Sequence, residues 1–238
     1  VEIPAAFVER LRAVGCAAHF CKVAKLTNRP FEDAWQKPQN WMRGDDPHLQ
    51  AWLAEGGNYG VVAGEGLAIF DADSEEGRKV QEARLPPTLT VKTPGGGYHA
   101  YYACQDMADE RIRLRDKEDG GHIGDIQGRG RMCVGPGSIR DDEKRQGTYT
   151  VVADVPIASV TVADLRKALA DLAVPEKELD KTFALAKRAV DKGLDFDIMR
   201  LFTDEAKAKF KQRGDEIFGP HPIHGSRTGT NFWIDVEK

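Results

Sequence analysis

The stretch Gly66-Leu-Ala-Ile-Phe-Asp-Ala-Asp73 runs from an apolar segment directly into two carboxylates. The apolar run predicts a buried β-strand, and alternation along a strand places Asp71 and Asp73 on one face. Neighbouring carboxylates are typical ligands of hard cations such as Mg²⁺. The alternative is a helix start, in which Asp73 caps a helix predicted for residues 75–83 and Glu76 completes a capping box. The sequence alone leaves both interpretations open.

Short apolar segments bounded by glycine or proline lie on both sides of this stretch and predict further strands. They are residues 59–63, 88–92, 98–103, 122–127, 131–134 and 148–152. Apolar residues at helical spacing predict helices at residues 4–14 and 47–55, the second opened by Asp46. Strands with an inserted helix indicate an α+β sheet domain.

After Pro156 the pattern becomes helical, with predicted helices at residues 162–172, 176–192 and 204–213. We therefore expect two parts, a core at residues 1–155 and a helical module at residues 156–238. The end of the chain, from residue 215, is rich in Gly, Pro and His and is expected to be a loosely held extension.

The composition is ordinary for a globular protein: 238 residues, 41% hydrophobic, with a net charge of −4. The apolar runs fall short of the ~20 residues of a membrane span, and no signal segment opens the chain. We therefore expect a cytoplasmic protein without a membrane partner. A negative net charge argues against nucleic-acid binding, but the distribution of charge matters more than its sum, and a stretch crowded with arginines can form a local basic groove. Those arginines are Arg111, Arg113, Arg115, Arg129, Arg131, Arg140 and Arg145.

A second motif is Thr93-Pro-Gly-Gly-Gly-Tyr-His99, in which a run of glycines precedes a predicted strand. Exposed backbone N–H groups of such a run can line a triphosphate, while His99 donates to a phosphate oxygen. The alternative is an ordinary hairpin turn with a half-buried histidine.

A third motif places Asp125 inside the predicted strand 122–127, before a glycine and arginine turn. An aspartate among Ile and Gly in a strand is unfavourable unless it has a partner. A shared metal ion or Arg131 is the expected partner. The alternative is a solvent-facing residue of an edge strand.

The order of these three motifs resembles the bifunctional primase-polymerase domain of the archaeo-eukaryotic primase superfamily. The resemblance covers about residues 37–149. It rests on Lys37-Pro38 with Trp41, Asn58-Tyr-Gly with Gly64, Phe70-Asp-Ala-Asp73, the 93–99 motif, and Asp125-Ile-Gln-Gly-Arg-Gly with Gly135-Pro-Gly-Ser138. It implies an α+β fold, with an RRM-like palm sheet and a small N-terminal α/β lobe, followed here by the helical module.

The resemblance also implies site residues. Asp71, Asp73 and Asp125 correspond to the metal carboxylates of the family, and His99 to its phosphate-contacting histidine. The backbone around Gly96 and Ser138 is expected near the incoming nucleotide. Charge and position add three basic candidates for nucleotide binding, which are Lys92, Arg129 and Arg131.

The implied activity is that of a DNA primase/polymerase, which makes and extends primers on single-stranded DNA with two Mg²⁺ or Mn²⁺ ions. The implied partners are a template, a primer and dNTP or NTP, with a helicase in the same parent chain or replisome. Relatives serve plasmids and mobile elements. A basic helical module, with Lys207, Lys209, Lys211 and Arg213, is expected to help initiation, although a solvated helix face is the alternative.

The sequence departs from the family at one position and lacks one accessory feature. The family commonly has a small hydroxyl residue two places before the histidine, where this chain has Gly97. Some relatives carry a zinc stem, but Cys104 and His122 are too few for a tetrahedral site, so no structural zinc is expected there. Cys16 and Cys21, with His19 between them, are expected to be buried thiols rather than ligands.

Two other functions fit parts of the pattern. A catalytically inactive module for single-stranded nucleic-acid binding or replication initiation keeps the fold, but it has no use for clustered carboxylates. A rolling-circle nuclease needs two histidines around one hydrophobic residue, and His99-Ala-Tyr-Tyr102 supplies one.

Overall fold

The computed structural model describes residues 1–108, 111–116, 121–143, 145–174, 211–213, 216–219 and 232–235. The chain divides into two compact units, Val1–Arg113 with Ile123–Ala170, and Leu114–His122 with Asp171–Lys238. The architecture is α+β, as predicted, and its sheets are largely antiparallel. In the part of the chain that the structure describes, no helix combines the length and apolar character needed to cross a membrane.

Four α-helices lie in the described residues of the first unit, and side-chain caps fix the start of three of them. They are α1 (Ala5–Ala13), α2 (Pro47–Ala54), α3 (Glu75–Arg84) and α4 (Val162–Leu169), with a short 3₁₀ helix η1 at Pro38–Asn40. Asp46 caps α2 by accepting from two backbone N–H groups, as predicted. Ser74 caps α3, and Thr161 forms a capping box with Asp164 at α4.

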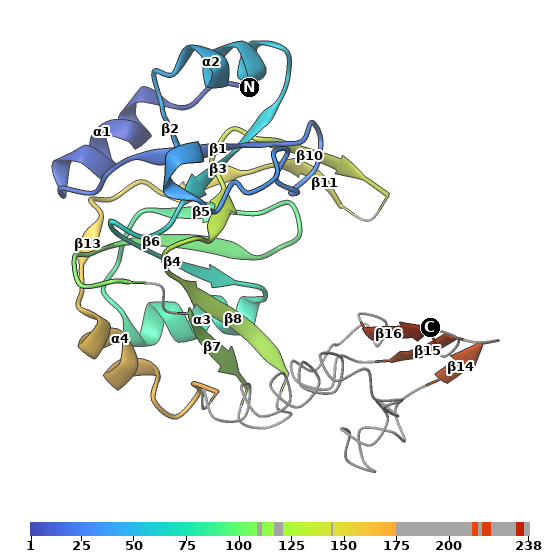
Figure 1. Cartoon of the computed structure of the whole chain (residues 1–238). Helices are drawn as coiled ribbons and strands as arrows, with labels where there is room; N and C mark the ends of the chain where they lie inside the picture. Colours follow the sequence, from blue (N-terminus) through green and yellow to red (C-terminus); the bar gives the residue numbers. More distant parts are fainter. Residues whose placement is uncertain are drawn as a thin grey trace, which may run out of the picture. The chain divides into compact units, whose positions relative to one another are not determined.

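The larger sheet carries the motifs singled out above. Its strands follow the order β12-β5-β6-β4-β8-β7, and β13 pairs with β6 in parallel. The bounds are β4 (Gly66–Ala72), β5 (Thr90–Lys92), β6 (Tyr98–Cys104), β7 (Arg111–Arg115), β8 (His122–Gln127), β12 (Thr150–Ala153) and β13 (Ala158–Ser159). Strand β4 is therefore central, between β6 and β8 (Figure 1).

A second sheet and a hairpin complete the first unit. The sheet has the order β2-β1-β3-β9, and the hairpin joins β10 to β11. Their bounds are β1 (His19–Val23), β2 (Met42–Arg43), β3 (Asn58–Val62), β9 (Met132–Val134), β10 (Ile139–Asp142) and β11 (Arg145–Thr148). Asn58 is fully buried and binds this hairpin through the backbone of Ile139, donating at 2.6 Å and accepting at 2.9 Å.

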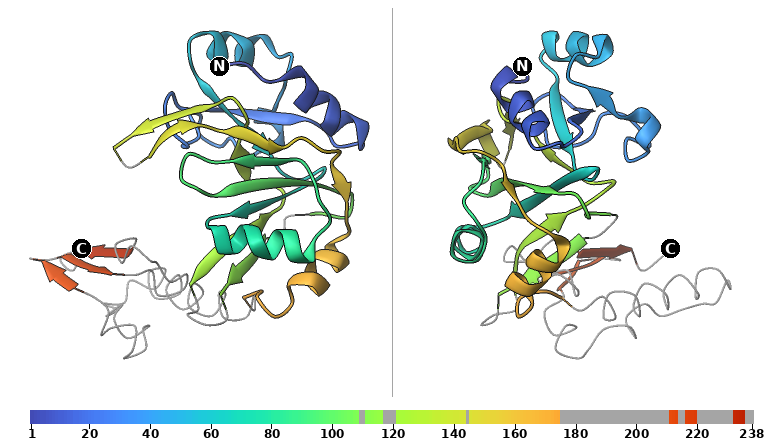
Figure 2. Two further views of the ribbon diagram at one scale, coloured as in Figure 1. Left: turned by 180° about the vertical axis from the view of Figure 1, so that it is seen from behind. Right: turned by 90° about the vertical axis from the view of Figure 1, so that its left-hand side faces the viewer.

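The hydrophobic core lies between the two sheets. From β4 it takes Leu67 and Ile69, whose partners across β6 are Ala103 and Tyr101. Tyr101 also packs edge-on against Phe7 of α1, with ring centroids 5.2 Å apart. Helix α3 covers the opposite face of the larger sheet (Figures 1 and 2). Side chains alternate along β4, so Asp71, two places after Ile69, projects to the same face as the core residues. It lies near the end of the strand, at the edge of the core.

The C-terminal predictions are partly wrong. Three short strands, β14 (Lys211–Arg213), β15 (Glu216–Gly219) and β16 (Phe232–Asp235), form an antiparallel sheet within the second unit. Lys211–Arg213 was expected to end a helix, and residues from 215 onward a loose extension. The local sequences Glu-Ile-Phe-Gly and Phe-Trp-Ile-Asp have the β-branched and aromatic residues that favour strands. The predicted helix at 176–192 and most of that at 204–213 lie outside the described residues, as do Lys207 and Lys209.

The predicted domain boundary lies inside the first unit. Ala158–Ser159 adds a strand to β6, and Leu165 and Leu169 of α4 are fully buried. Residues 156–170 accordingly contact the core rather than starting a separate body.

Candidate active site

Asp71, His99 and Asp125 lie in one row across three neighbouring strands. In the register of the larger sheet, Asp71 of β4 is the direct partner of His99 on β6 and of Asp125 on β8. Residues directly opposite one another in antiparallel strands project to the same face. Three side chains from separate parts of the sequence therefore meet on the core face of the sheet, where β4 ends.

Asp73 follows the end of β4, and another residue caps the helix after it. The sheet pattern continues to Asp73, because its backbone N–H donates to the carbonyl of Ile123 at 3.1 Å. Ser74, rather than Asp73, accepts from Gly77 N–H at 3.2 Å at the start of α3. The capping alternative for Asp73 is therefore wrong. A carboxylate oxygen of Asp73 lies within 4.8 Å of one of Asp125.

Asp125 is buried and has Arg111 as its partner. The Arg111 guanidinium on β7 donates from Nε to Oδ1 at 2.9 Å and from its terminal nitrogen to Oδ2. The solvent-facing alternative is wrong, since the residue is 3% exposed. The sequence analysis expected Arg131 or a metal in this role. A two-point guanidinium–carboxylate pair is the arrangement that lowers the cost of burying such a charge.

Arg131 lies near the Arg111–Asp125 pair, and the charges of both residues affect its pKa. Among the described contacts, Arg131 makes no hydrogen bond to Asp125. Burial lowers the pKa of Arg131, the positive charge of Arg111 lowers it further, and Asp125 raises it. Its Nε is buried without a hydrogen-bond partner in the described part of the chain.

His99 is a buried, neutral imidazole with a defined tautomer. Burial lowers its pKa to about 4, although the Val134 hydrogen bond and the charge of Asp73 act in the other direction. Its Nδ1 lies 3.2 Å from the Val134 carbonyl, which only accepts, so Nδ1 carries the proton. Nε2 then has a free lone pair, 3.4 Å from Oδ1 of Asp71. Donation to a phosphate, as predicted, requires a second proton on this ring.

Cys133 lies close enough to all three carboxylates for their charges to affect its pKa. This thiol of β9 is buried, and burial raises its pKa well above the usual value. The charges of Asp71, Asp73 and Asp125 raise it further. All three carboxylates therefore act on one buried atom. The Cys133 sulfur, a nitrogen of His99 and an oxygen of Asp71 also lie within 4.8 Å of one another.

These residues open onto a pocket of about 130 Å³. Its basic side comes from the hairpin, where Arg140 lies on β10 and Arg145 on β11. Tyr149 stacks on His99 with ring centroids 5.8 Å apart. The residues lining the pocket are Asn28, Asp71, Ala72, Asp73, Thr93, Gly95, Gly97, His99, Met132, Cys133, Val134, Arg140, Arg145 and Tyr149. One pocket thus holds carboxylates on one side and guanidinium groups on the other.

The glycine turn, residues 93–97, forms the rim of this pocket. Gly96 has a φ of +83°, a conformation that favours glycine, and open space where a Cβ would stand. A Cβ at Gly97 would lie 2.5 Å from the carbonyl oxygen of Ala72, at the end of β4. A side chain at position 97, such as the hydroxyl residue common in the family, would therefore clash with β4 in this structure. A Cβ at Gly95 would lie 2.9 Å from a guanidinium nitrogen of Arg145, so the Arg145 side chain packs on this glycine.

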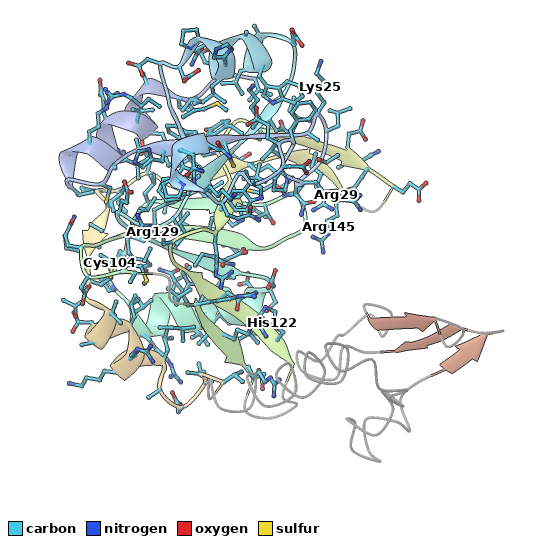
Figure 3. The ribbon with its side chains drawn as sticks, in the orientation of Figure 1. Lys25, Arg29, Cys104, His122, Arg129 and Arg145 are labelled. Carbon is cyan, nitrogen blue, oxygen red and sulfur yellow. The ribbon has the colours of Figure 1, made fainter. Side chains whose placement is uncertain are left out.

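Three of the predicted nucleotide-binding residues lie elsewhere. Lys92 pairs with Tyr98, the neighbour of His99, so it projects to the other face of the sheet and lines a separate pocket there. Arg129 pairs with Glu65 at 3.5 Å, before the start of β4, and Figure 3 shows it at the opposite end of the sheet from Arg145. Ser138 is fully buried, with its Oγ 3.5 Å from the backbone nitrogen of Tyr59.

Other residues of the site were missed by the sequence analysis. Arg140 and Arg145 belong to the arginine-rich region noted there, but nothing in their spacing showed which arginines face the carboxylates. Cys133 and Tyr149 carry no local signal, because their place depends on packing between sheets. Arg111 was noted as one of the crowded arginines, but its role as the partner of Asp125 was not predicted.

One protein family and a solved structure are similar to this chain. No curated protein matches the chain. A solved structure described as "Crystal structure of primase RepB'" aligns with a TM-score of 0.41 and 16% identity, covering 78% of this chain and 66% of that one. The model of the family "Bifunctional DNA primase/polymerase, N-terminal" matches residues 12–165. Since this match spans more than half of the sequence, the chain belongs to the Prim-Pol family of bifunctional DNA primase/polymerase N-terminal domains.

Proposed function

We propose that this protein is a template-dependent nucleotidyl transferase that makes and extends primers on single-stranded DNA and releases pyrophosphate. The observation that carries the proposal is the row of Asp71, Asp125 and His99, with Asp73 beside it, at a pocket that also contains Arg140 and Arg145. Family membership supports a primase/polymerase type of activity. In this proposal the larger sheet serves as the RRM-like palm.

The carboxylates fit a pair of Mg²⁺ or Mn²⁺ ions by their chemistry. Asp71, Asp73 and Asp125 supply oxygen ligands, which these ions prefer, and their charges act on one common point at Cys133. When bound, such ions lower the pKa of a primer 3′-hydroxyl and neutralise phosphate charge. Arg111 holds both oxygens of Asp125, so it would orient that carboxylate and balance its charge.

The protein's own cations, Arg140 and Arg145, would hold the triphosphate. Arg140 is already oriented, since its Nε donates to Asp142 at 2.5 Å. Arg145 packs on Gly95 of the glycine turn, in which the N–H groups of Gly96 and Gly97 donate within the turn to Thr93 at 3.1 and 3.0 Å. Guanidinium groups are usual phosphate partners in proteins. Positioning and charge complementarity dominate phosphoryl transfer, and no strong base is required.

Initiation without a primer needs additional contacts, because two free nucleotides and a template must be held together. We assign this role to the residues beyond the first unit, from 171 to the end of the chain, which include the basic stretch around Lys211. The DNA template and free nucleotides are the partners in this proposal, and a replicative helicase is a further one.

The direct experiment supplies the protein with a single-stranded template, labelled nucleotides and Mg²⁺ or Mn²⁺, with and without an annealed primer. Products in both lanes are expected. Products in the primed lane alone would restrict the activity to polymerisation. No products in either lane, with retained binding of the template, would replace this proposal with that of a non-catalytic binding module.

A further inference from the structure

Three side chains that can bind a metal ion meet inside the candidate site. Nε2 of His99 lies 3.4 Å from Oδ1 of the Asp71 carboxylate. The sulfur of Cys133, a nitrogen of His99 and an oxygen of Asp71 lie within 4.8 Å of one another, and Cys133 and His99 are buried. A carboxylate oxygen, an imidazole nitrogen and a thiol sulfur thus form one cluster of possible ligands for a single cation.

This set of donors differs in kind from the three carboxylates. Oxygen ligands suit Mg²⁺, whereas a combination of thiolate and imidazole suits Zn²⁺ and related ions. Zinc binds these ligands at about 2.0–2.3 Å in a tetrahedron, so two ligand atoms should lie about 3.3–3.8 Å apart. The 3.4 Å between Asp71 and His99 is within that range. The Cys133 sulfur, within 4.8 Å of the other two ligand residues, would complete this geometry by moving closer to them.

Both the carboxylate and the imidazole also have the outer partners that metal ligands usually have. His99 donates its Nδ1–H to the Val134 carbonyl at 3.2 Å, which aims Nε2 at the cluster. Gln127 lies 3.4 Å from Oδ2 of Asp71, on the side away from His99, and it is 8% exposed. Histidine ligands of zinc commonly donate their second nitrogen to a backbone carbonyl or carboxylate, and ligating carboxylates are hydrogen-bonded in turn.

We infer that Asp71, His99 and Cys133 form a binding site for Zn²⁺, and that zinc bound there inhibits nucleotidyl transfer. Three protein ligands leave a fourth position open towards the pocket, where a water molecule binds. Binding converts the Cys133 thiol to a thiolate, and its proton is released to solvent. Asp71 cannot serve zinc and the Mg²⁺ of the proposed reaction in the same geometry, and the zinc would stand where the triphosphate enters.

The two halves of this inference depend on different premises. Zinc binding rests on the geometry of the three side chains alone. Inhibition rests on the proposed function, because it presupposes that Asp71 takes part in nucleotide incorporation. The experiment therefore measures binding without any substrate first, and inhibition afterwards.

Binding is measured by titrating the reduced, full-length protein with Co²⁺, which occupies zinc sites and gives a near-ultraviolet charge-transfer band when a thiolate is a ligand. We expect this band in the unaltered protein, and we expect Zn²⁺ to abolish it by displacement. Cys133→Ser should remove the band and weaken zinc affinity by at least ~10- to 100-fold, the loss seen when even an outer partner of a metal ligand is removed.

Cys16→Ser is the matched control. Cys16 is another buried thiol, and it donates to the Gly66 carbonyl at 2.8 Å, a bond that serine also makes. This variant should keep the band and the zinc affinity. If Cys133→Ser loses its cooperative melting transition, Cys133→Ala takes its place. No band in the unaltered protein, or an undiminished band in the Cys133 variant, would overturn the site.

Inhibition is measured by primer extension at fixed Mg²⁺ with increasing Zn²⁺, each protein being compared with its own zinc-free rate. The Cys133 variant should need at least ~10-fold more zinc for half-inhibition, in proportion to its lost affinity. Equal sensitivity of both proteins would refute the inhibitory role. A cobalt–thiolate band in a protein that incorporates no nucleotide would leave the zinc site standing and refute the polymerase instead.

Discussion

Asp71 and Asp125 are direct partners across β4 and β8, although they come from distant parts of the sequence. The pairing of β4 with β8 can shift only by whole residues, and a shift of β8 by one residue would turn Asp125 to the opposite face of the sheet. The side-by-side placement of the two carboxylates is therefore built into the strand pairing. It does not depend on flexible loops, which is the condition under which a site keeps its geometry before substrate binds.

Asp71→Asn tests the role of the carboxylate charge. The change keeps the size of the side chain, and Asp71 is partly exposed, so the melting temperature should stay close to that of the unaltered protein. Nucleotide incorporation should fall by at least ~100-fold, the scale of losing one group that stabilises developing charge. Primer extension and thermal melting are measured on the same preparation. Normal incorporation by a folded Asp71→Asn protein would remove Asp71 from the mechanism.

Arg111 and Asp125 should behave as a coupled pair in stability measurements. Arg111→Met removes the guanidinium that neutralises the buried Asp125 carboxylate, which should cost roughly 3–5 kcal/mol of unfolding free energy. Asp125→Asn should abolish incorporation and cost less stability, because no buried anion remains. The double variant should be more stable than the sum of the two single losses predicts. Additive losses in urea unfolding would show that the two side chains do not interact.

A comparison of Arg145→Ala with Lys92→Ala tests which face of the sheet binds the nucleotide. Both changes remove one exposed positive charge close to the glycine turn, but only Arg145 lines the pocket with the carboxylates. We expect Arg145→Ala to raise the KM for nucleotide by about 10- to 150-fold, equivalent to one charge-assisted hydrogen bond of ~1.5–3 kcal/mol. Lys92→Ala should leave this KM unchanged. An equal effect of the two changes in steady-state kinetics would point to general electrostatics rather than a specific contact.

Removal of residues 175–238 should separate extension from initiation. This truncation keeps β13 and α4, whose buried leucines belong to the core of the first unit, so the shortened protein should fold. We expect it to extend an annealed primer at close to the full-length rate. Synthesis without a primer should fall by at least ~10-fold, since the additional contacts to template and nucleotides are lost. Equal loss of both activities would contradict this division of roles.

The sequence predicted the centre of the fold well, because the signals there are local. The apolar run into Asp71 gave β4, and the glycines and β-formers around it gave β6 and β8, with β8 matching the predicted bounds. The order of three motifs then predicted which strands carry polar side chains. The predicted convergence of Asp73 and Asp125 is also found.

The sequence could not predict placements that depend on strand parity or on partners in other strands. Lys92 is one residue away from Val91, the partner of His99, and that single step puts it on the face of the sheet opposite His99. Arg129 follows Asp125 closely in sequence, but a strand advances ~3.3 Å per residue, so the chain has already left the site. The choice of Arg111 over Arg131 as the partner of Asp125 depends on which arginine the next strand delivers. No local pattern contains that information.

The close approach of Gly97 to the Ala72 carbonyl has a consequence for substrate selection. With no room for a side chain, and with its N–H already donated to Thr93 Oγ1 at 3.0 Å, this part of the rim offers no group that reads a nucleobase. Phosphate binding is left to guanidinium groups such as Arg140 and Arg145, and phosphate is a feature that all four nucleotides share. A rim of this kind does not distinguish the nucleobases, and the choice of base is left to pairing with the template strand.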